Sequence, residues 1–109
     1  MLMSKQEEAI VKVFKNSLEE RYPGEILRVL VFGSKARGDA TDKSDIDVLV
    51  VSRFDDWKKA DAIRAIGYSL DIEIGSKLSI QVLSEKHLEH LRFERFQFIE
   101  NVDRDSVLI

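Results

Sequence analysis

The sequence predicts a small α/β domain in which helices pack on a mixed β-sheet, with the elements in the order α-β-β-α-β-α. The run ILRVLVF is nearly continuously apolar and rich in branched residues, as expected of a strand buried on both faces, and IDVLVV makes a second strand. A third run, KLSIQVL, alternates polar and apolar residues. The stretches around these runs carry apolar residues at helical intervals instead, and this mixture favours the α/β class.

The first half of the chain contains one helix and two strands. Ser4-Lys5-Gln6-Glu7 has the spacing of a capping box, so we expect a helix from about residue 5 to Tyr22. Pro23-Gly24 ends this helix. Ile26–Phe32 then forms the first strand, and Ile46–Val51 forms the second after a polar segment.

The second half begins with a helix that Asp55-Asp56 can cap. Trp57 stands at the start of the apolar face of this helix, so we expect it to pack in the core rather than to stack on a nucleobase. Gly75 is the expected stop signal, and Lys77–Leu83 is the expected third strand.

A last helix is expected from Ser84-Glu85 to about Val102, followed by a short edge strand at 107–109. Its buried stripe leaves Phe93 and Phe96 partly off the apolar face. Two interpretations stay open: the helix wraps deeply into the core, or the two phenylalanines form a surface for a partner protein or for a homo-oligomer.

Composition narrows the classes of function. The chain has 109 residues, the usual size of one domain, and we treat 1–109 as a single domain. It contains no cysteine, which excludes disulfides, thiolate nucleophiles and cysteine zinc sites. Its formal net charge of -3 gives no strong nucleic-acid signal, and no apolar run is long enough for a membrane span. The N-terminus lacks the apolar core of a signal peptide, which favours the cytoplasm.

A pair of carboxylates opens the second strand. Side chains alternate along a strand, so Asp45 and Asp47 are expected on one face with Cβ atoms roughly 7 Å apart. Two carboxylates placed in this way can hold Mg²⁺ while phosphates and water fill its other positions. Asp39 and Asp42, in the loop before the pair, are expected to form turns or to face solvent.

The segment after the first strand supplies the features of an anion site. Gly33 has no Cβ and lets a phosphate approach the backbone, and Ser34 can cap a short helix whose N–H groups favour an anion. Lys35 and Arg37 add positive charge, although Arg37 could equally brace the loop through carboxylates. A connection that returns directly to the second strand would bring this turn to the carboxylate pair, a combination that suits a metal-bound nucleoside triphosphate.

The segment GSKARGDATDKSDID resembles the signature of the nucleotidyltransferases related to DNA polymerase β: Gly-Ser, ten residues, then Asp-x-Asp. The chain's short length and its ending further resemble the minimal nucleotidyltransferases, or MNT proteins, which are paired with HEPN proteins. The resemblance implies that Gly33 and Ser34 hold the triphosphate and that Asp45 and Asp47 bind Mg²⁺. It also implies an NTP substrate, with ATP the expected nucleotide, and a HEPN partner that makes this chain the antitoxin of a toxin-antitoxin pair.

One residue of the family pattern is missing. The third carboxylate of the family falls on the strand KLSIQVL, where the expected counterpart is Ser79, with Gln81 on the same face. Asp71 and Glu73 lie close in sequence but near the expected end of the helix. A third carboxylate completes the metal site in the family, so its loss puts turnover in doubt.

Three functions therefore remain open at the level of the sequence. The leading one is a Mg²⁺-dependent transfer of a nucleoside monophosphate to a hydroxyl acceptor. The second is a nucleotide-binding module that neutralises a partner by contact without chemistry. The third is a catalytic fragment that acts on a small molecule together with a second chain. The acceptor, the nucleobase preference and the oligomeric state cannot be predicted from these residues.

Overall fold

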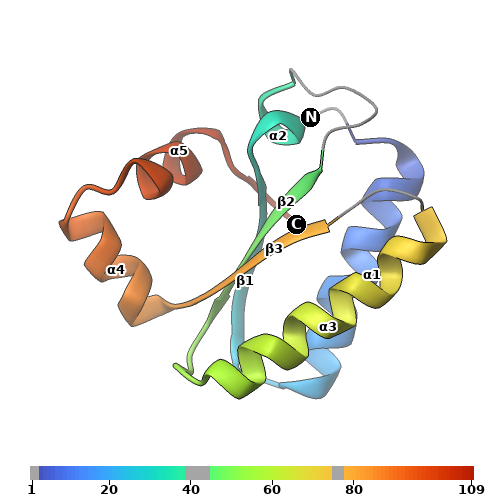
Figure 1. Cartoon of the computed structure of the whole chain (residues 1–109), viewed down its shortest axis with the longest axis horizontal. Coiled ribbons are helices and arrows are strands. Elements are labelled where there is room, and N and C mark those ends of the chain that lie inside the picture. The colour runs from blue at the N-terminus through green and yellow to red at the C-terminus, as the bar shows by residue number, and fades with distance from the viewer. Residues whose placement is uncertain (1–2, 39–44, 75–77) are drawn as a thin grey trace.

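The computed structural model describes residues 3–38, 45–74 and 78–109, and the side chains of 71–74 are excluded from the description. Its sheet has four strands in the order β3-β2-β1-β4. β1 runs antiparallel to both β2 and β4, whereas β2 and β3 are parallel. The mixed sheet and its covering helices confirm the predicted fold class (Figure 1).

The first half contains α1 (Lys5–Arg21), β1 (Ile26–Phe32), α2 (Ser34–Arg37) and β2 (Ile46–Ser52). The capping box at the start of α1 is present, because Ser4 accepts from the N–H of Glu7 and Glu7 accepts from the N–H of Ser4. The single turn α2 is the one element in this half that the predicted order lacked.

The second half contains α3 (Trp57–Ile74), β3 (Leu78–Ser84), α4 (Glu85–Phe93), α5 (Gln97–Asp105) and β4 (Val107–Leu108). The carboxylate of Asp56 accepts from the N–H groups of Lys58 and Lys59, so it caps α3 as expected. The predicted stop at Gly75 and the predicted strand residue Lys77 lie outside the described residues.

Helices cover both faces of the sheet (Figure 1). α1 and α3 pack on one face, over the side chains of Ile46, Val48 and Val50 from β2. α4 and α5 pack on the other face, over Leu49 and Val51. This alternation along β2 places Asp47 on the α4 and α5 side, since it stands two residues before Leu49. Among the helices in the described ranges, none is long and apolar enough to cross a membrane.

The last helix is broken, which corrects the single helix expected up to Val102. Arg95 adopts a positive φ of 57° between α4 and α5, and the chain turns back there. The turn lets both short helices reach the same face of the sheet, where Leu88 of α4 and Ile99 and Val102 of α5 are buried together. Arg92 of α4 joins the two helices by donating from Nε and Nη2 to the Asp103 carboxylate, at 2.9 Å each.

The two phenylalanines at this turn are exposed. Phe93 is 83% exposed and Phe96 is 52% exposed. The expectation of a helix wrapped deeply into the core is therefore wrong for these two side chains. Their role as a contact surface stays a prediction.

Gly67 lets α3 approach the sheet closely. A Cβ at this position would overlap Cδ1 of Ile80 and would lie 3.2 Å from Cε1 of Phe14. Gly67→Ala should therefore lower the free energy of unfolding by about 1–2 kcal/mol, because the cost of overpacking exceeds the gain in helix propensity. Ile80→Val removes the overlapping methyl group, so the double variant should recover part of this loss in urea unfolding. Additive losses in the double variant would contradict the packing explanation.

Candidate active site

The predicted anion turn begins where β1 ends. Gly33 follows Phe32 directly and has a φ of 74° and a ψ of -153°, a backbone conformation that only glycine adopts readily. Its carbonyl accepts from the N–H of Arg37 at 3.0 Å, which closes the turn of α2 that starts at Ser34. The Gly-Ser pair thus stands at the junction of a strand and a helical turn, as the sequence predicts.

The carboxylate pair lies at the start of the neighbouring strand. β1 and β2 pair antiparallel with Phe32 opposite Asp47, so the end of β1 and the start of β2 lie at the same edge of the molecule. Asp47 is half-buried and Asp45 is exposed. The antiparallel pairing brings the Gly-Ser turn and the two carboxylates together, while Asp39 and Asp42 lie outside the described residues.

Gly33 and Asp47 are in direct contact. A Cβ on Gly33 would overlap Oδ2 of Asp47 and would lie 3.1 Å from its Cγ. The absence of a side chain at 33 therefore makes room for a carboxylate of the chain itself. Sequence reasoning explained this glycine by the approach of a phosphate, and the structure adds a second reason that only the register of β1 and β2 reveals.

Gly33→Ala should displace the Asp47 carboxylate and lower the affinity for a Mg²⁺-nucleotide by about tenfold or more, while the backbone strain costs about 1 kcal/mol of stability. Gly24→Ala is the matched control, because Gly24 has a φ of 75° and no atom within 4 Å of its would-be Cβ. Thermal melting should show similar losses for both variants. Calorimetric titration should show the binding loss only for Gly33→Ala, and equal affinities in the two variants would refute the steric explanation.

Asp47 stands in an unfavourable environment for a negative charge. Burial raises its pKa, and the neighbouring Asp45 raises it further, while Arg37 acts in the opposite direction. Arg37 is exposed and lies close enough to interact with Asp47, so both roles considered for it from the sequence, contact with phosphate and bracing through a carboxylate, remain compatible with its position.

Lys35 does not contribute its charge to this site, which corrects the expectation from the sequence. Its side chain is buried, and its Nζ lies 3.4 Å from both carboxylate oxygens of Glu7 in α1. The same Glu7 caps α1 through Ser4. Lys35 therefore ties α2 to the start of α1, a role that requires long-range contact and leaves no local signal in the sequence.

Ser79 lies beside Asp47, where the sequence predicts the counterpart of the family's third carboxylate. β2 and β3 are parallel with Asp47 opposite Ser79, and paired residues in adjacent strands point to the same face. Gln81 is exposed and lies opposite Leu49, one further step along that face. The register thus favours Ser79 over Gln81 as the neighbour of the carboxylate pair. The side chains of Asp71 and Glu73 lie outside the described residues.

The residues present suit a hard cation held by two carboxylates. Asp45 is close enough to Asp47 to raise the pKa of the Asp47 carboxyl, and a divalent cation would relieve that repulsion. Within the described ranges, no group of three or more histidine, aspartate or glutamate side chains is placed to hold a metal ion. A cation here would therefore take its remaining ligands from phosphates and water.

An apolar wall stands next to the carboxylates on the β1 side. Phe32, opposite Asp47, meets Phe98 of α5 edge to face with ring centroids 5.4 Å apart. The helical spacing predicts either Phe98 or Ile99 for the buried stripe of the last helix, and the sequence indicates no role for Phe32 at the site. The position of Phe32 directly before Gly33 was the one available signal.

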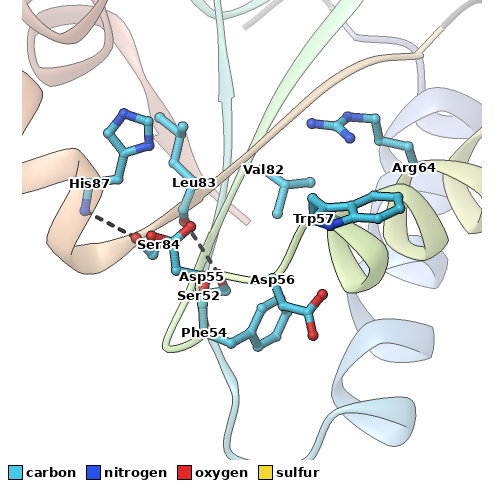
Figure 2. Close-up of a pocket in the computed structure, with 11 residues that line it drawn as sticks. Ser52, Phe54, Asp55, Asp56, Trp57, Arg64, Val82, Leu83, Ser84 and His87 are labelled. Atoms are coloured by element: carbon cyan, nitrogen blue, oxygen red, sulfur yellow. Dashed lines mark hydrogen bonds between the residues drawn. The ribbon is translucent and has the colours of Figure 1, made fainter.

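A pocket of about 190 Å³ lies at the opposite ends of β2 and β3, near Ser52 and Ser84 (Figure 2). Trp57 is 71% exposed at this pocket, so its predicted burial is wrong. Trp57 is the first residue of α3 and lies before the part of the helix that packs on the core. The first fully buried side chain of α3 is Ile63. Ser52 is five residues beyond Asp47, about 17 Å along a strand, so this pocket is separate from the carboxylate site.

The fold and the position of the carboxylates together define the class: a small α/β domain with paired aspartates beside a Gly-Ser turn, as in phosphoryl-transfer domains. The family described as "Nucleotidyltransferase domain" matches residues 11–104. The chain therefore belongs to the nucleotidyltransferase domain family, which confirms the resemblance at the level of the superfamily.

Two curated relatives come from Methanocaldococcus jannaschii. The chain is 49% identical over 49 residues to "Putative protein adenylyltransferase MJ0604", covering 45% of this chain and 49% of that protein. It is 43% identical over 42 residues to "Putative protein adenylyltransferase MJ0141", covering 38% of this chain and 42% of that protein. The matched segments thus span half or less of these relatives.

A solved structure shows the same fold. It is described as a crystal structure of a "putative nucleotidyltransferase" from Sulfolobus solfataricus, with a TM-score of 0.60 and 24% identity. The match covers 92% of this chain and 76% of that one. At this level of identity the likeness shows the fold alone.

Proposed function

We propose that this chain transfers a nucleoside monophosphate from Mg²⁺-ATP to a hydroxyl group of a partner protein. The observation that carries the proposal is the contact of Gly33 with Asp47, which joins the Gly-Ser turn to the carboxylate pair. Membership of the nucleotidyltransferase domain family supports the type of reaction.

Each site residue has a separate task in this proposal. Gly33 and Ser34 hold the triphosphate at the start of α2, and Arg37 offers a guanidinium to its phosphate oxygens. Asp45 and Asp47 hold Mg²⁺, which when bound neutralises negative charge on the phosphates. Phe32, which pairs with Asp47, packs against Phe98 and adds apolar surface on the β1 side of this carboxylate.

The proposed reaction is an in-line displacement at the α-phosphorus. The acceptor oxygen forms a bond to phosphorus, the bond to the bridging oxygen of pyrophosphate breaks, and the hydroxyl proton leaves to solvent. The chain's contribution is to position the triphosphate and to hold the charges around it. With a serine at position 79, the described residues place no third carboxylate beside Asp47 to accept that proton.

The choice of ATP and of a protein acceptor rests on the relatives. Both M. jannaschii proteins carry the name "Putative protein adenylyltransferase". The choice of a HEPN protein as the partner rests only on the resemblance of the sequence to MNT proteins. In this proposal the chain acts as an antitoxin that modifies its partner.

A labelling experiment tests the proposal. The chain is incubated with ATP labelled at the α-phosphate, Mg²⁺ and a HEPN protein encoded beside it. We expect label on one hydroxyl residue of the partner and a mass gain of one adenylyl group. The Asp45→Asn variant serves as the control and should transfer no label. The proposal is contradicted if the partner stays unlabelled and no pyrophosphate is released.

A second candidate is a binding module that neutralises its partner by contact. Ser79 favours this candidate, because a serine beside Asp47 cannot bind a cation as a carboxylate does. The same incubation separates the two: the module predicts a stable complex and an inhibited partner without any label.

A further inference from the structure

The position of the Gly-Ser turn fixes the side from which an acceptor must approach, if the proposed function holds. Gly33 and α2 lie on the β1 side of Asp47, and in the proposed function they hold the phosphates that leave as pyrophosphate. In an in-line displacement the attacking and leaving oxygens stand on opposite sides of the phosphorus. The acceptor hydroxyl therefore arrives from the other side of Asp47, where β3 lies.

β3 is an edge of the sheet. In the described part of the chain its one strand neighbour is β2, with which it forms seven consecutive register pairs from Ile46–Leu78 to Ser52–Ser84. In Figure 1 β3 lies in front of β2, and no helix passes across it. Gln81 in the middle of β3 is exposed, and Ser79 and Val82 are half-buried. The outer side of this strand is accessible.

This edge lacks the features that usually prevent strand addition. Proteins protect edge strands by shortness, bulges, proline or charged side chains. The opposite edge, β4, is protected by its length of two residues. β3 is seven residues long, pairs without a register shift, and its sequence LSIQVLS contains neither proline nor a charged residue. An extended segment can add to it through backbone hydrogen bonds.

The register places such a segment at the carboxylates. A residue of an added strand that pairs with Ser79 points to the same face as Ser79 and Asp47. It would stand two strand spacings from Asp47, on the order of 10 Å between Cα atoms. The small side chain of Ser79 between them leaves space for the α-phosphate above the sheet.

We propose that the edge of β3 binds an extended segment of the acceptor protein as an added strand, with its serine, threonine or tyrosine paired with Ser79. The substrate class of the site is then a β-forming peptide segment rather than a folded surface or a small alcohol. This inference rests on the proposed function, since the direction of attack depends on the triphosphate lying at Gly33.

Hydrogen exchange of the whole chain tests the proposal with a defined probe. The probe is a short peptide of alternating threonine and valine with a central tyrosine, and the control is the same peptide with its backbone nitrogens methylated. We expect the probe to slow exchange in 78–84 by about tenfold, because added hydrogen bonds protect the outward amides of β3. The methylated peptide should have no such effect. The sample contains Mg²⁺ and a nonhydrolysable ATP analogue.

Several results would overturn the inference. Equal protection by the methylated peptide, no protection of 78–84, or protection of the turn at Phe93 and Phe96 instead would each exclude strand addition at β3. Protection that appears without peptide as the chain is concentrated would assign the edge to a second copy. Binding of the ATP analogue is measured in parallel by calorimetry. If the analogue binds while β3 stays unprotected, only the acceptor inference fails; if the analogue does not bind, the proposed function fails.

Discussion

Asp47→Asn should lower the Mg²⁺-dependent affinity for a nonhydrolysable ATP analogue by at least about 100-fold. Loss of a residue that only orients a metal ligand already lowers metal affinity by about 10–100-fold, and loss of the ligand itself should cost more. The amide keeps the shape of the carboxylate but not its charge, so the cation and the phosphates would be left with less compensation. Asp45→Asn should act in the same direction. Calorimetric titration with and without Mg²⁺ measures both effects.

Asp55→Asn is the matched control for this pair. Asp55 is an exposed carboxylate near the other end of β2, at the pocket that contains Trp57. The Asp55→Asn variant should bind the Mg²⁺-nucleotide with the same affinity as the wild type. Unchanged affinity in both Asp45→Asn and Asp47→Asn would exclude the carboxylate pair as the metal site.

Ser79→Asp should raise the rate of nucleotidyl transfer to the true partner by about 100-fold, within the range that a positioned general base contributes. The register places this side chain beside Asp47 on the same face of the sheet, so an aspartate there could bind a cation and accept the hydroxyl proton. The wild-type chain should bind Mg²⁺-nucleotide and turn over slowly. Single-turnover kinetics with labelled ATP separates the chemical step from binding.

Gln81→Asp gives the same substitution on the same strand and face, one step further from Asp47. Because Gln81 pairs with Leu49 and is exposed, its aspartate should leave the rate unchanged. An efficient wild-type enzyme whose rate does not respond to Ser79→Asp would show that another residue supplies the third carboxylate, such as Glu73 or one from the partner.

The main strands could be predicted from the sequence because burial on both faces leaves a strong local pattern. The run ILRVLVF coincides with β1, and IDVLVV forms all but the last residue of β2. The capping box at Ser4 and the cap at Asp56 likewise predicted where α1 and α3 begin. These features depend on neighbouring residues, which a single sequence displays.

Features that depend on contacts between distant segments could not be predicted. The break at Arg95 follows from the need of α4 and α5 to cover one face of the sheet. The burial of Lys35 follows from the position of Glu7, 28 residues away. Trp57 matched an apolar helical stripe, but it precedes the part of α3 that reaches the core.

The candidate site was predicted from the spacing of its residues, but its assembly depends on register. Gly33, Arg37, Asp45 and Asp47 come together because β1 and β2 pair with Phe32 opposite Asp47. The contact between Gly33 and the Asp47 carboxylate also depends on this register, which the sequence does not specify. The roles of these residues in binding stay predictions.

In the proposed function, Asp47 stands in a position that is unfavourable for its negative charge, and a bound metal-nucleotide would offset this cost. Its pKa is raised above the usual 3.8, first by burial and then by Asp45. As the pH rises from 3.8 through this raised pKa, the folded state binds more protons than the unfolded state, so stability falls and the loss persists at neutral pH. Asp47→Asn removes the loss, and binding of a ligand to the folded state offsets it.

The most direct test is the melting temperature of the wild type and of Asp47→Asn at pH 7, each with and without Mg²⁺ and the ATP analogue. Without ligand, Asp47→Asn should melt above the wild type, and this difference should vanish below the usual pKa of 3.8. With ligand at 100 times its Kd, the wild type should gain about 2.7 kcal/mol of stability and Asp47→Asn almost none, so the order of the two reverses. If Mg²⁺ and the ATP analogue do not stabilise the wild type, or if they stabilise Asp47→Asn equally, Asp47 does not bind the metal-nucleotide.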